Sequence, residues 1–411
     1  MVCHNRCMFK MFKQKKRANS TGMLTSREIT KSAIFALWGE VAAARRSIAS
    51  RDFASSRTNL IFHDVAGREL PRDLISFAIK KGCLGPTMAF LENSGMAPLL
   101  GPKESKRARR SLAYTDLRTE ATKREIERVF SRFSLEKIDA MLFKGYDIIN
   151  AYYRDNRTRC ATDIDILVQT HDYNKIPCAL FDLGYTTFDG ENSPWVKGTF
   201  CIDLHRDMWN SGRIAARRHL PTIPTNEIFI ASRPRSIGPA SYRSPDPADA
   251  FIITALHALK HSYLMDYWVM DAGVIILSEG GDRFIKTVLN RARSRNVSGP
   301  TGTMLWTLQH LYRFPLDREI VKAQTPGLTT KYLIRRAFKS TRFLHFGDIL
   351  LGSYIDNTRK KLYFIKEVLF PRPSVMAQEL GMKGAGEDLF SLYFLRARFL
   401  AKAAMRFFSS Q

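Results

Sequence analysis

The chain has 411 residues, of which 45% are hydrophobic and 11% aromatic. That is enough for two or three packed domains, and it excludes a disordered protein. The 64 Lys and Arg residues outnumber the 39 Asp and Glu residues, and the net charge of +25 favours acidic partners: nucleotides, nucleic acid, phosphorylated ligands or an anionic membrane surface. No basic run is interleaved with aromatic residues in a recognisable nucleic-acid module, so nucleic acid is a possible but not a favoured partner.

The six cysteines are scattered without a CxxC pair, which indicates reduced thiols and a cytoplasmic protein. No apolar run approaches the ~18 residues of a membrane span, and the basic N-terminus lacks the apolar segment of a signal peptide. Residues 1–26, including Cys3 and Cys7, are expected to form a basic disordered tail, or to contain sequence upstream of a start at Met23. Peripheral membrane contact and the oligomeric state remain open.

Residues 27–134 are predicted to form a helical region. Apolar residues at i, i+3 and i+4 spacing indicate a helix that begins near Pro71 and Asp73. The clearest helix runs from about 119 to 133, where apolar side chains follow an i, i+3, i+4, i+7 pattern and charged residues occupy the other positions.

Residues 135–210 are predicted to form a compact mixed α/β core. A short apolar strand at 140–143 ends in Lys144-Gly145, and a helix is expected at 146–153 before an acidic strand at 163–168. The elements expected next are a helix at 173–183 that ends at Gly184, a strand at 185–188, a hairpin loop at 189–194 and one return strand at 195–205.

Residues 211–246 are rich in Pro, Ser and Arg and are predicted to be a loop or linker, and residues 247–411 a helical C-terminal region with breaks at its Gly and Pro clusters. The basic amphipathic stretch 389–408 is expected either to dock on the protein's own core or to lie on an anionic membrane. The predicted fold is therefore mixed α/β (α+β), with a small mixed β-sheet core between mainly helical N- and C-terminal regions.

Asp163 and Asp165 are the most informative residues of the chain. Side chains at i and i+2 of a strand point to the same side, so both carboxylates lie on one face of a partly buried strand. Two unneutralised carboxylates there would repel each other and raise each other's pKa, and a bound divalent cation removes that repulsion. Asp203, in the alternating strand that ends at His205, would complete the metal site if the two strands are neighbours.

Lys144 and Gly145 suit a phosphate-binding turn. Gly145 has no Cβ and allows close approach of its backbone to phosphate, the following helix offers free N–H groups, and Lys144 adds a positive charge. Together with Mg²⁺ or Mn²⁺ on the three acids, this set suits transfer of an NMP from an NTP to an acceptor oxygen, and ATP is the expected NTP. His205 shares the strand face of Asp203 and is assigned to nucleotide binding.

These motifs resemble the nucleotidyltransferase superfamily, and within it a poorly characterised bacterial family with a Lys-Gly strand end before an Asp-Ile-Asp strand. The matching segments are 143–145, 162–168, 184–185 and 202–205, with further similarity in 247–277 and 369–371. The resemblance implies a metal-dependent nucleotidyltransferase that forms a nucleotidyl-acceptor and pyrophosphate from an NTP and a small-molecule, sugar or peptide acceptor. The alternatives are a decayed site in a binding or regulatory protein, and an enzyme that acts on RNA.

Two other groups of residues have several interpretations. His257 and His261 have the i, i+4 spacing of a zinc protease helix, but Ala258 stands where the catalytic Glu would be. Both are expected to be core or inter-domain histidines, or else to line the nucleotide cleft. The arginines that precede the acid pair, Arg154, Arg157 and Arg159, could reach a bound phosphate, but they are expected to lie on a solvated loop.

Overall fold

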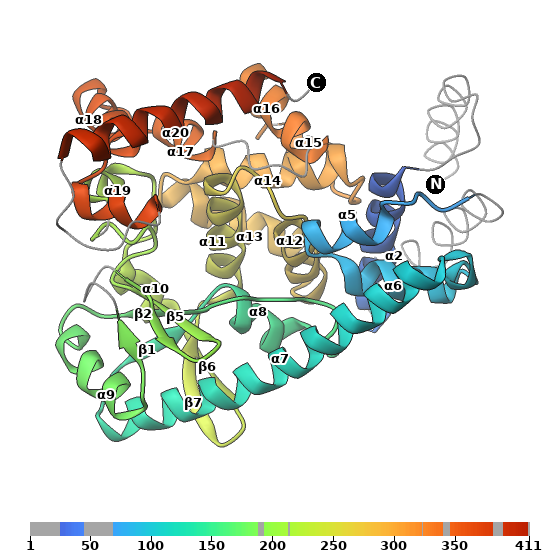
Figure 1. Ribbon diagram of the computed structural model, residues 1–411, viewed down its shortest axis with the longest axis horizontal. Helices are drawn as coiled ribbons and strands as arrows, with labels where there is room; N and C mark the ends of the chain where they lie inside the picture. The colour runs from blue at the N-terminus through green and yellow to red at the C-terminus, as the bar shows by residue number, and fades with distance from the viewer. Residues whose placement is uncertain are drawn as a thin grey trace.

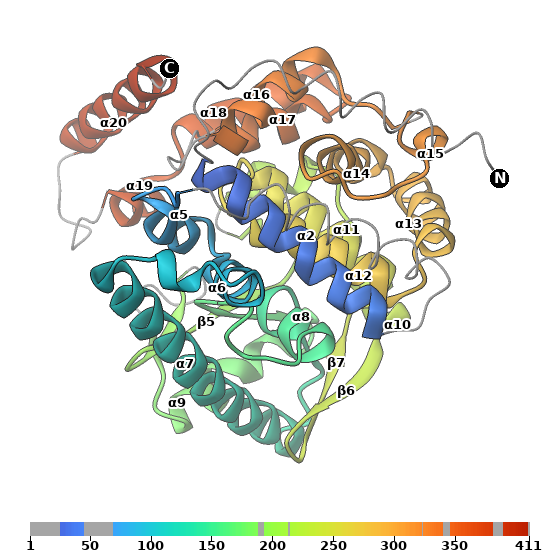
Figure 2. The same ribbon diagram turned by 90° about the vertical axis from the view of Figure 1, so that its right-hand side faces the viewer.

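The computed structural model describes residues 25–44, 69–187, 193–212, 214–322, 324–339, 346–380 and 389–409. Most of the predicted tail, with Cys3, Cys7 and Met23, lies outside the described residues, as does most of the predicted hairpin loop, residues 188–192. Figures 1 and 2 show a sheet with α7 beneath it and a layer of helices above it.

The N-terminal part is helical, as predicted. It comprises α2 (Ser26–Ala44), α5 (Leu74–Lys81), α6 (Leu84–Asn93), a 3-10 turn (Ala97–Leu99) and α7 (Pro102–Leu135). α5 begins directly after Asp73 and buries its apolar residues, which confirms the predicted helix start. α7 begins 17 residues earlier than predicted because its first half buries little more than Ala108 and Thr115, so no apolar period marks it in the sequence.

The sheet has seven strands in the order β3-β4-β5-β2-β1-β7-β6. β2 and β5 are parallel, as are β1 and β7, whereas the other neighbouring pairs are antiparallel. This mixed sheet with helical regions on both sides of it in the chain confirms the predicted fold class. The strands are β1 (Ala140–Leu142), β2 (Ile164–Val168), β3 (Thr186–Thr187), β4 (Trp195–Lys197), β5 (Phe200–His205), β6 (Arg233–Ile237) and β7 (Ala240–Ser244).

The sheet separates two apolar cores. One face of β1, β2 and β5 carries Leu142, Ile166 and Leu204, which pack with apolar residues of α7 and α9 (Ile176–Asp182) in what we call the sheet core. The opposite face carries Met141 and Leu167, which join a larger helical core built mainly from the C-terminal helices. Because strand side chains alternate, Asp165 lies on the same side of β2 as Leu167 and faces the helical layer.

Two segments differ from prediction. The predicted single return strand 195–205 is two antiparallel strands, β4 and β5, joined by a turn at Gly198, whose φ of 56° suits a two-residue hairpin. The predicted loop 211–246 contains a 3-10 turn (Ala215–His219), α10 (Thr225–Ala231) and the β6–β7 hairpin. Pro234 suggested a loop, but β6 is an edge strand, where a missing N–H is tolerated.

The C-terminal part is helical, with predicted breaks at Gly280-Gly281, Pro326-Gly327 and Pro371–Pro373 confirmed by helix ends or starts. Its helical core also includes Phe35 and Trp38 of α2. The indole N–H of Trp38 donates a hydrogen bond to the carbonyl of Met270 at 3.1 Å. The helices are α11 (Pro247–Lys260), α12 (Tyr267–Ser278), α13 (Asp282–Ser294), α14 (Ser298–Leu311), α15 (Arg318–Lys322), α16 (Leu328–Lys339), α17 (Gly347–Ser353), α18 (Thr358–Leu369), α19 (Pro373–Glu379) and α20 (Leu389–Ser409).

Within the described ranges, no helix combines the length and apolarity that crossing a bilayer requires. α20 docks on the protein through Leu392 and Arg396, both buried, and the Arg396 guanidinium donates to the carbonyls of Val368 and Leu369. The exposed Phe390 and Phe394 leave the predicted membrane alternative open.

Candidate active site

The turn between β1 and α8 (Gly145–Tyr152) holds Lys144 in an unusual conformation. Lys144 has φ of 59° and ψ of −134°, a region that L-residues rarely adopt and that costs on the order of 1–3 kcal/mol. Gly145 opens the helix, and a Cβ added there would lie only 3.2 Å from the Ala161 Cβ. The turn therefore sits tightly against the segment that leads into the acidic strand.

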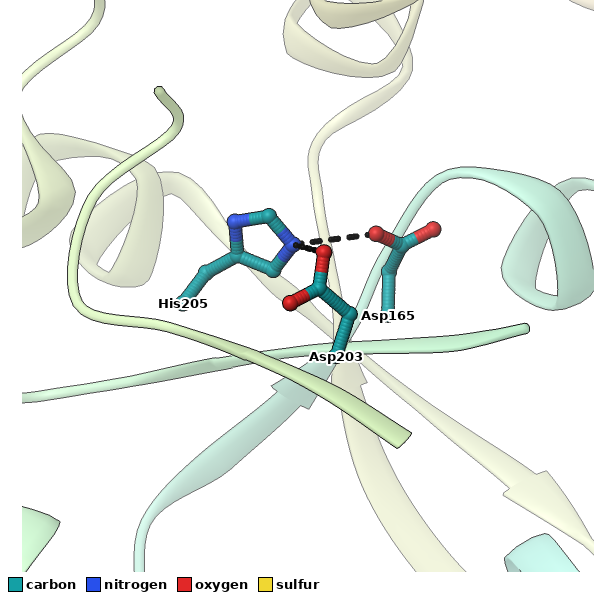
Figure 3. A group of neighbouring side chains, drawn as sticks. All are labelled: Asp165, Asp203 and His205. Atoms are coloured by element: carbon teal, nitrogen blue, oxygen red, sulfur yellow. Dashed lines mark hydrogen bonds and ion pairs between the residues drawn. The ribbon is translucent and has the colours of Figure 1, made fainter. Parts of the chain in front are cut away.

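Parallel pairing of β2 with β5 brings the predicted acids together. Asp165 is directly opposite Asp203, and Leu167 is opposite His205, so all three polar side chains lie on the face toward the helical layer. His205 Nε2 lies 3.0 Å from Asp165 Oδ1 and 3.1 Å from Asp203 Oδ2 (Figure 3). One ligand atom of each residue lies within 4.8 Å of the other two.

Lys144 supplies a second positive group to the same acids. Its Nζ lies 2.8 Å from Asp165 Oδ1 and 3.3 Å from His205 Nε2, and both Lys144 and Asp165 side chains are about nine-tenths buried. Lys144 and His205 thus lie between the buried carboxylate of Asp165 and the partly exposed carboxylate of Asp203. Such a concentration of carboxylates is stable only with a compensating charge.

The donor atoms fit a divalent cation. Carboxylate oxygens suit Mg²⁺ and Mn²⁺, and an imidazole nitrogen suits Mn²⁺ better than Mg²⁺. The buried Nδ1 of His205 has no hydrogen-bond partner among the described residues, so the ring is held only by its Nε2 contacts and by packing against Phe143.

Charge coupling sets the protonation of this group. Burial alone would raise the carboxyl pKa values, but Lys144 and His205 lower the pKa of Asp165, and His205 and Lys144 hold that of Asp203 well below its usual range. For His205, burial and Lys144 lower the pKa, but the two carboxylates outweigh them and raise it. Two carboxyl groups with lowered pKa values therefore face the Lys144 ammonium and an imidazole whose pKa is raised.

Asp163 lies beside this group but outside its compact set of ligand atoms. It precedes β2, and its Oδ1 accepts a hydrogen bond from the Thr162 hydroxyl at 3.0 Å. Burial and the neighbouring Asp165 raise its pKa despite Lys144. Asp163 is therefore the acid whose charge is least compensated in this arrangement, and an added cation would lower its pKa.

α11 and α12 form the opposite wall. A small pocket is bounded by Lys144, Asp163 and Asp165 on one side. Its other side is formed by Thr254 and His257 of α11 and by Tyr267, Trp268 and Asp271 of α12. His257 therefore lines this pocket, whereas His261 is not among its lining residues; the two imidazole rings are tilted by 50°, with their centroids 4.5 Å apart. Both rings also pack against Trp268, at 5.2 and 5.5 Å.

The two histidines are neutral bases in this setting. Burial and nearby cations, including Lys144, lower the pKa of His257 well below its usual value and that of His261 to about 3. Burial and Arg217 likewise lower the pKa of Lys260, on the same helix, to about 7. The helical wall thus contributes basic groups around the acids, and within the described residues the compact ligand group excludes both histidines.

A buried ion pair joins the loop before Asp163 to α12. Arg159 contacts both carboxylate oxygens of Asp271 at 3.0–3.1 Å, Tyr153 donates to Asp271 at 2.8 Å, and the guanidinium lies 3.7 Å from the centre of the Tyr267 ring. Arg159 and Asp271 are 3% and 0% exposed. The prediction that all three loop arginines are solvated is wrong for Arg159, because its partner lies 112 residues away in the sequence.

The structure brings together five predicted site residues, namely Lys144, Gly145, Asp165, Asp203 and His205, with Asp163 adjacent. Sequence reasoning missed Arg159, Tyr267 and Trp268 as pocket residues. Trp268 lies seven residues after His261, and its place near the two histidines is the only sequence feature that points to it as a pocket residue. Nothing local distinguishes Arg159 from the exposed Arg157.

A model of the family described as "Uncharacterised nucleotidyltransferase" matches residues 69–313, more than half of the chain. The matched segment includes Lys144, both acid-bearing strands and the helical wall with His257. Comparison with curated proteins and with solved structures finds no match.

Proposed function

Because the chain belongs to this family of uncharacterised nucleotidyltransferases, we propose that it moves an NMP from an NTP to a hydroxyl or phosphate oxygen of an acceptor. The observation that carries the proposal is the pairing of Asp165 with Asp203 on parallel strands, with Lys144 and His205 converging on their carboxylates. A merely structural acid pair would not need so many buried ionisable groups in one place.

Each residue has a role that its position supports. Asp165 and Asp203, with Asp163 beside them and His205 Nε2 within reach, would hold Mg²⁺ or Mn²⁺, which when bound neutralises the triphosphate and polarises the α-phosphate. The α8 N-terminus at Gly145 offers free backbone N–H groups to phosphate. Lys144 leaves Asp165 for a phosphate oxygen once the acids have another counter-ion.

The reaction is an in-line displacement. An acceptor oxygen forms a bond to the α-phosphorus, the bond from that phosphorus to the bridging oxygen breaks, and pyrophosphate leaves. Asp203, whose side chain is 38% exposed, accepts a hydrogen bond from the acceptor hydroxyl, and the proton passes to water. In line with the sequence prediction, we propose that the NTP is ATP and that the reaction takes place in the cytoplasm.

A decayed site in a binding or regulatory protein is the competing proposal. It predicts that the biological activity survives loss of the acids, whereas the enzyme proposal predicts its near-complete loss. The exposed Asp356 on the loop before α18 gives a matched control for an Asp→Asn change, because α18 lies on the far side of the helical layer from the sheet (Figure 1).

The deciding experiment is calorimetric binding of the four NTPs with Mn²⁺, with Mg²⁺ and with chelator. We expect wild type and Asp356→Asn to bind at least one NTP only in the presence of metal, and Asp165→Asn to lose that binding by at least about 100-fold. Binding of no NTP by folded wild-type protein, or equal binding by Asp165→Asn, contradicts the enzyme proposal.

A further inference from the structure

The first half of α7 presents a row of four positive side chains and one tyrosine on one face. Lys103, Arg107, Arg110, Tyr114 and Arg118 are spaced i, i+4, i+7, i+11 and i+15, which places them along one side of the helix. The two acids of this half, Glu104 and Asp116, fall at other angular positions. We call this row the basic face of α7.

The basic face borders an open groove beside α5. The groove has a volume of about 540 Å³ and is lined by Ile79 of α5 and by Lys103, Lys106, Arg107, Arg110, Ser111 and Tyr114 of α7. Its four cationic side chains are exposed, and within the described part of the chain none has an acidic partner. Unpaired cations that line a concave surface attract an anionic ligand.

The basic face ends beside the two segments that lead into the acid-bearing strands. The Arg118 guanidinium donates to the carbonyl of Thr162 at 2.8 Å, one residue before Asp163, and to that of Thr199 at 3.2 Å, one residue before β5. From Lys103 to Arg118 the helix rises by about 22 Å. Figure 2 shows α7 running as one uninterrupted helix past α6 toward the sheet.

We infer that the basic face of α7 binds single-stranded nucleic acid, and that the terminal hydroxyl of the bound strand reaches the Asp165–Asp203 site as the acceptor. The acceptor role rests on the proposed function, whereas strand binding does not. Cations one helical turn apart match a run of backbone phosphates, and a ~22 Å track is longer than a small acceptor needs. Tyr114, 59% exposed on the same face, offers a ring on which a base can stack.

The sequence prediction did not favour nucleic acid because no aromatic residue lies within the run Lys103–Arg110. The structure places Tyr114 one turn beyond Arg110 on the same face, so the aromatic and basic groups combine in space. In the acceptor reaction the terminal hydroxyl oxygen bonds to the α-phosphorus, pyrophosphate leaves, the hydroxyl proton passes to water, and the strand grows by one nucleotide.

Binding is tested with the full chain, chelator and no NTP, so that catalysis plays no part. Fluorescence anisotropy of labelled RNA and DNA strands of about 12 nucleotides is followed over a salt series. The α7 variant carries Arg107→Gln and Arg110→Gln on the basic face, and Lys106→Gln at the groove beside it. Its control carries the same charge change at exposed positions of α13: Arg283→Gln, Lys286→Gln and Arg293→Gln.

We expect the α7 variant to bind at least about tenfold more weakly at low salt, with a log–log salt slope smaller by about 2, which corresponds to three lost phosphate contacts. Tyr114→Ala should weaken binding at least about fivefold without changing the slope. The α13 variant should match wild type. No strand binding, an equal loss in the α13 variant, or equally strong competition by polyglutamate of similar length overturns the inference.

The acceptor role is tested separately with labelled strands, Mn²⁺ and each NTP. We expect products one nucleotide longer, with a raised KM for the strand in the α7 variant and no product with Asp165→Asn, which still binds the strand. Metal-dependent NTP binding without extension of either strand overturns the acceptor inference and leaves the proposed function intact. If the wild-type protein binds no NTP, the proposed function is contradicted, whether or not the groove binds a strand.

Discussion

Lys144 has a strained backbone conformation in the β1–α8 turn, and its ammonium group contacts the Asp165 carboxylate. Its Nζ is 2.8 Å from Asp165, so in this structure it competes with any cation that binds the acids. We expect Lys144→Ala to bind Mn²⁺ roughly tenfold more tightly without nucleotide, about 1.4 kcal/mol, and to bind NTP more weakly. Alanine keeps the Cβ, so the turn conformation is strained equally in both proteins.

Titration calorimetry with Mn²⁺ alone, and then with NTP, measures both effects. Lys286→Ala, at an exposed position of α13, is the control and should change neither. Weaker Mn²⁺ binding by Lys144→Ala would mean that the ammonium organises the acids for the metal instead of competing with it.

Asp147 provides a pH-dependent test of the α8 packing. It is 1% exposed, faces Tyr242 and Ser244 with Arg235 nearby, and burial raises its pKa from 3.8 to about 7. A raised folded-state pKa gives stability that is complete below the unfolded value and is lost as the pH rises through about 7. Asp147→Asn cannot ionise and should therefore gain stability relative to wild type between pH 4 and pH 8.

The shift of about three pKa units corresponds to a gain on the order of 4 kcal/mol at most. Chemical unfolding of both proteins at several pH values measures it, with Asp356→Asn as the control for a pH-independent difference. A difference between Asp147→Asn and wild type that stays constant from pH 4 to pH 8 would show that Asp147 does not titrate in this range.

The Arg159–Asp271 pair fixes the loop before β2 to α12. Asp271→Asn leaves a buried guanidinium without its counter-ion and should lower the free energy of unfolding by about 3–5 kcal/mol. It should also weaken NTP binding, because the loop positions Asp163. Arg157→Gln, in the exposed pair with Asp155, should change stability by at most about 0.5 kcal/mol.

A second variant separates charge from shape. Arg159→Met combined with Asp271→Leu removes both charges and keeps apolar volume, so it should recover most of the stability lost in Asp271→Asn. Denaturant unfolding of the three variants measures this. A double variant as unstable as Asp271→Asn would locate the effect in packing instead of charge.

Local patterns predicted the two acid-bearing strands well. In each strand the apolar residues alternate with the acid, so strand alternation alone places Asp165 and Asp203 on the faces opposite to those apolar residues. The same reasoning could not pair β2 with β5, since parallel pairing depends on the crossover between them. It also failed for β6 and β7, where Pro234 concealed an edge strand, and for Arg159, whose burial depends on a partner 112 residues away. The metal and nucleotide roles of the site residues stay predictions.

The helical core extends beyond the segment that matches the family. It takes Trp38 from α2 and Leu351 and Phe364 from α17 and α18, all at most 1% exposed. A Cβ on Gly273 would lie 2.3 Å from the Trp38 ring, so α2 and α12 are in intimate contact. The predicted boundary between a catalytic core and helical regions stays a prediction, but the packing ties these parts together.

A fragment of residues 69–313 should therefore fail to fold cooperatively, although it contains every proposed site residue. We expect a broad thermal transition and strong dye binding to exposed apolar surface, whereas a chain of residues 25–411 should unfold in one sharp transition. Calorimetry on both proteins checks this. A sharp transition in the fragment would show that the sheet and α11–α14 need no support from the flanking helices.

The same helical core constrains folding during synthesis. All residues of the sheet core lie between Ile126 and Tyr242, whereas the helical core is complete only when Phe364 has been made. At translation rates of about 5–20 residues per second, the intervening segment takes roughly 6 to 24 s to emerge. During that time the helical core that includes Met141 and Leu167 is incomplete on the ribosome, and chaperone supply should govern the yield of folded protein.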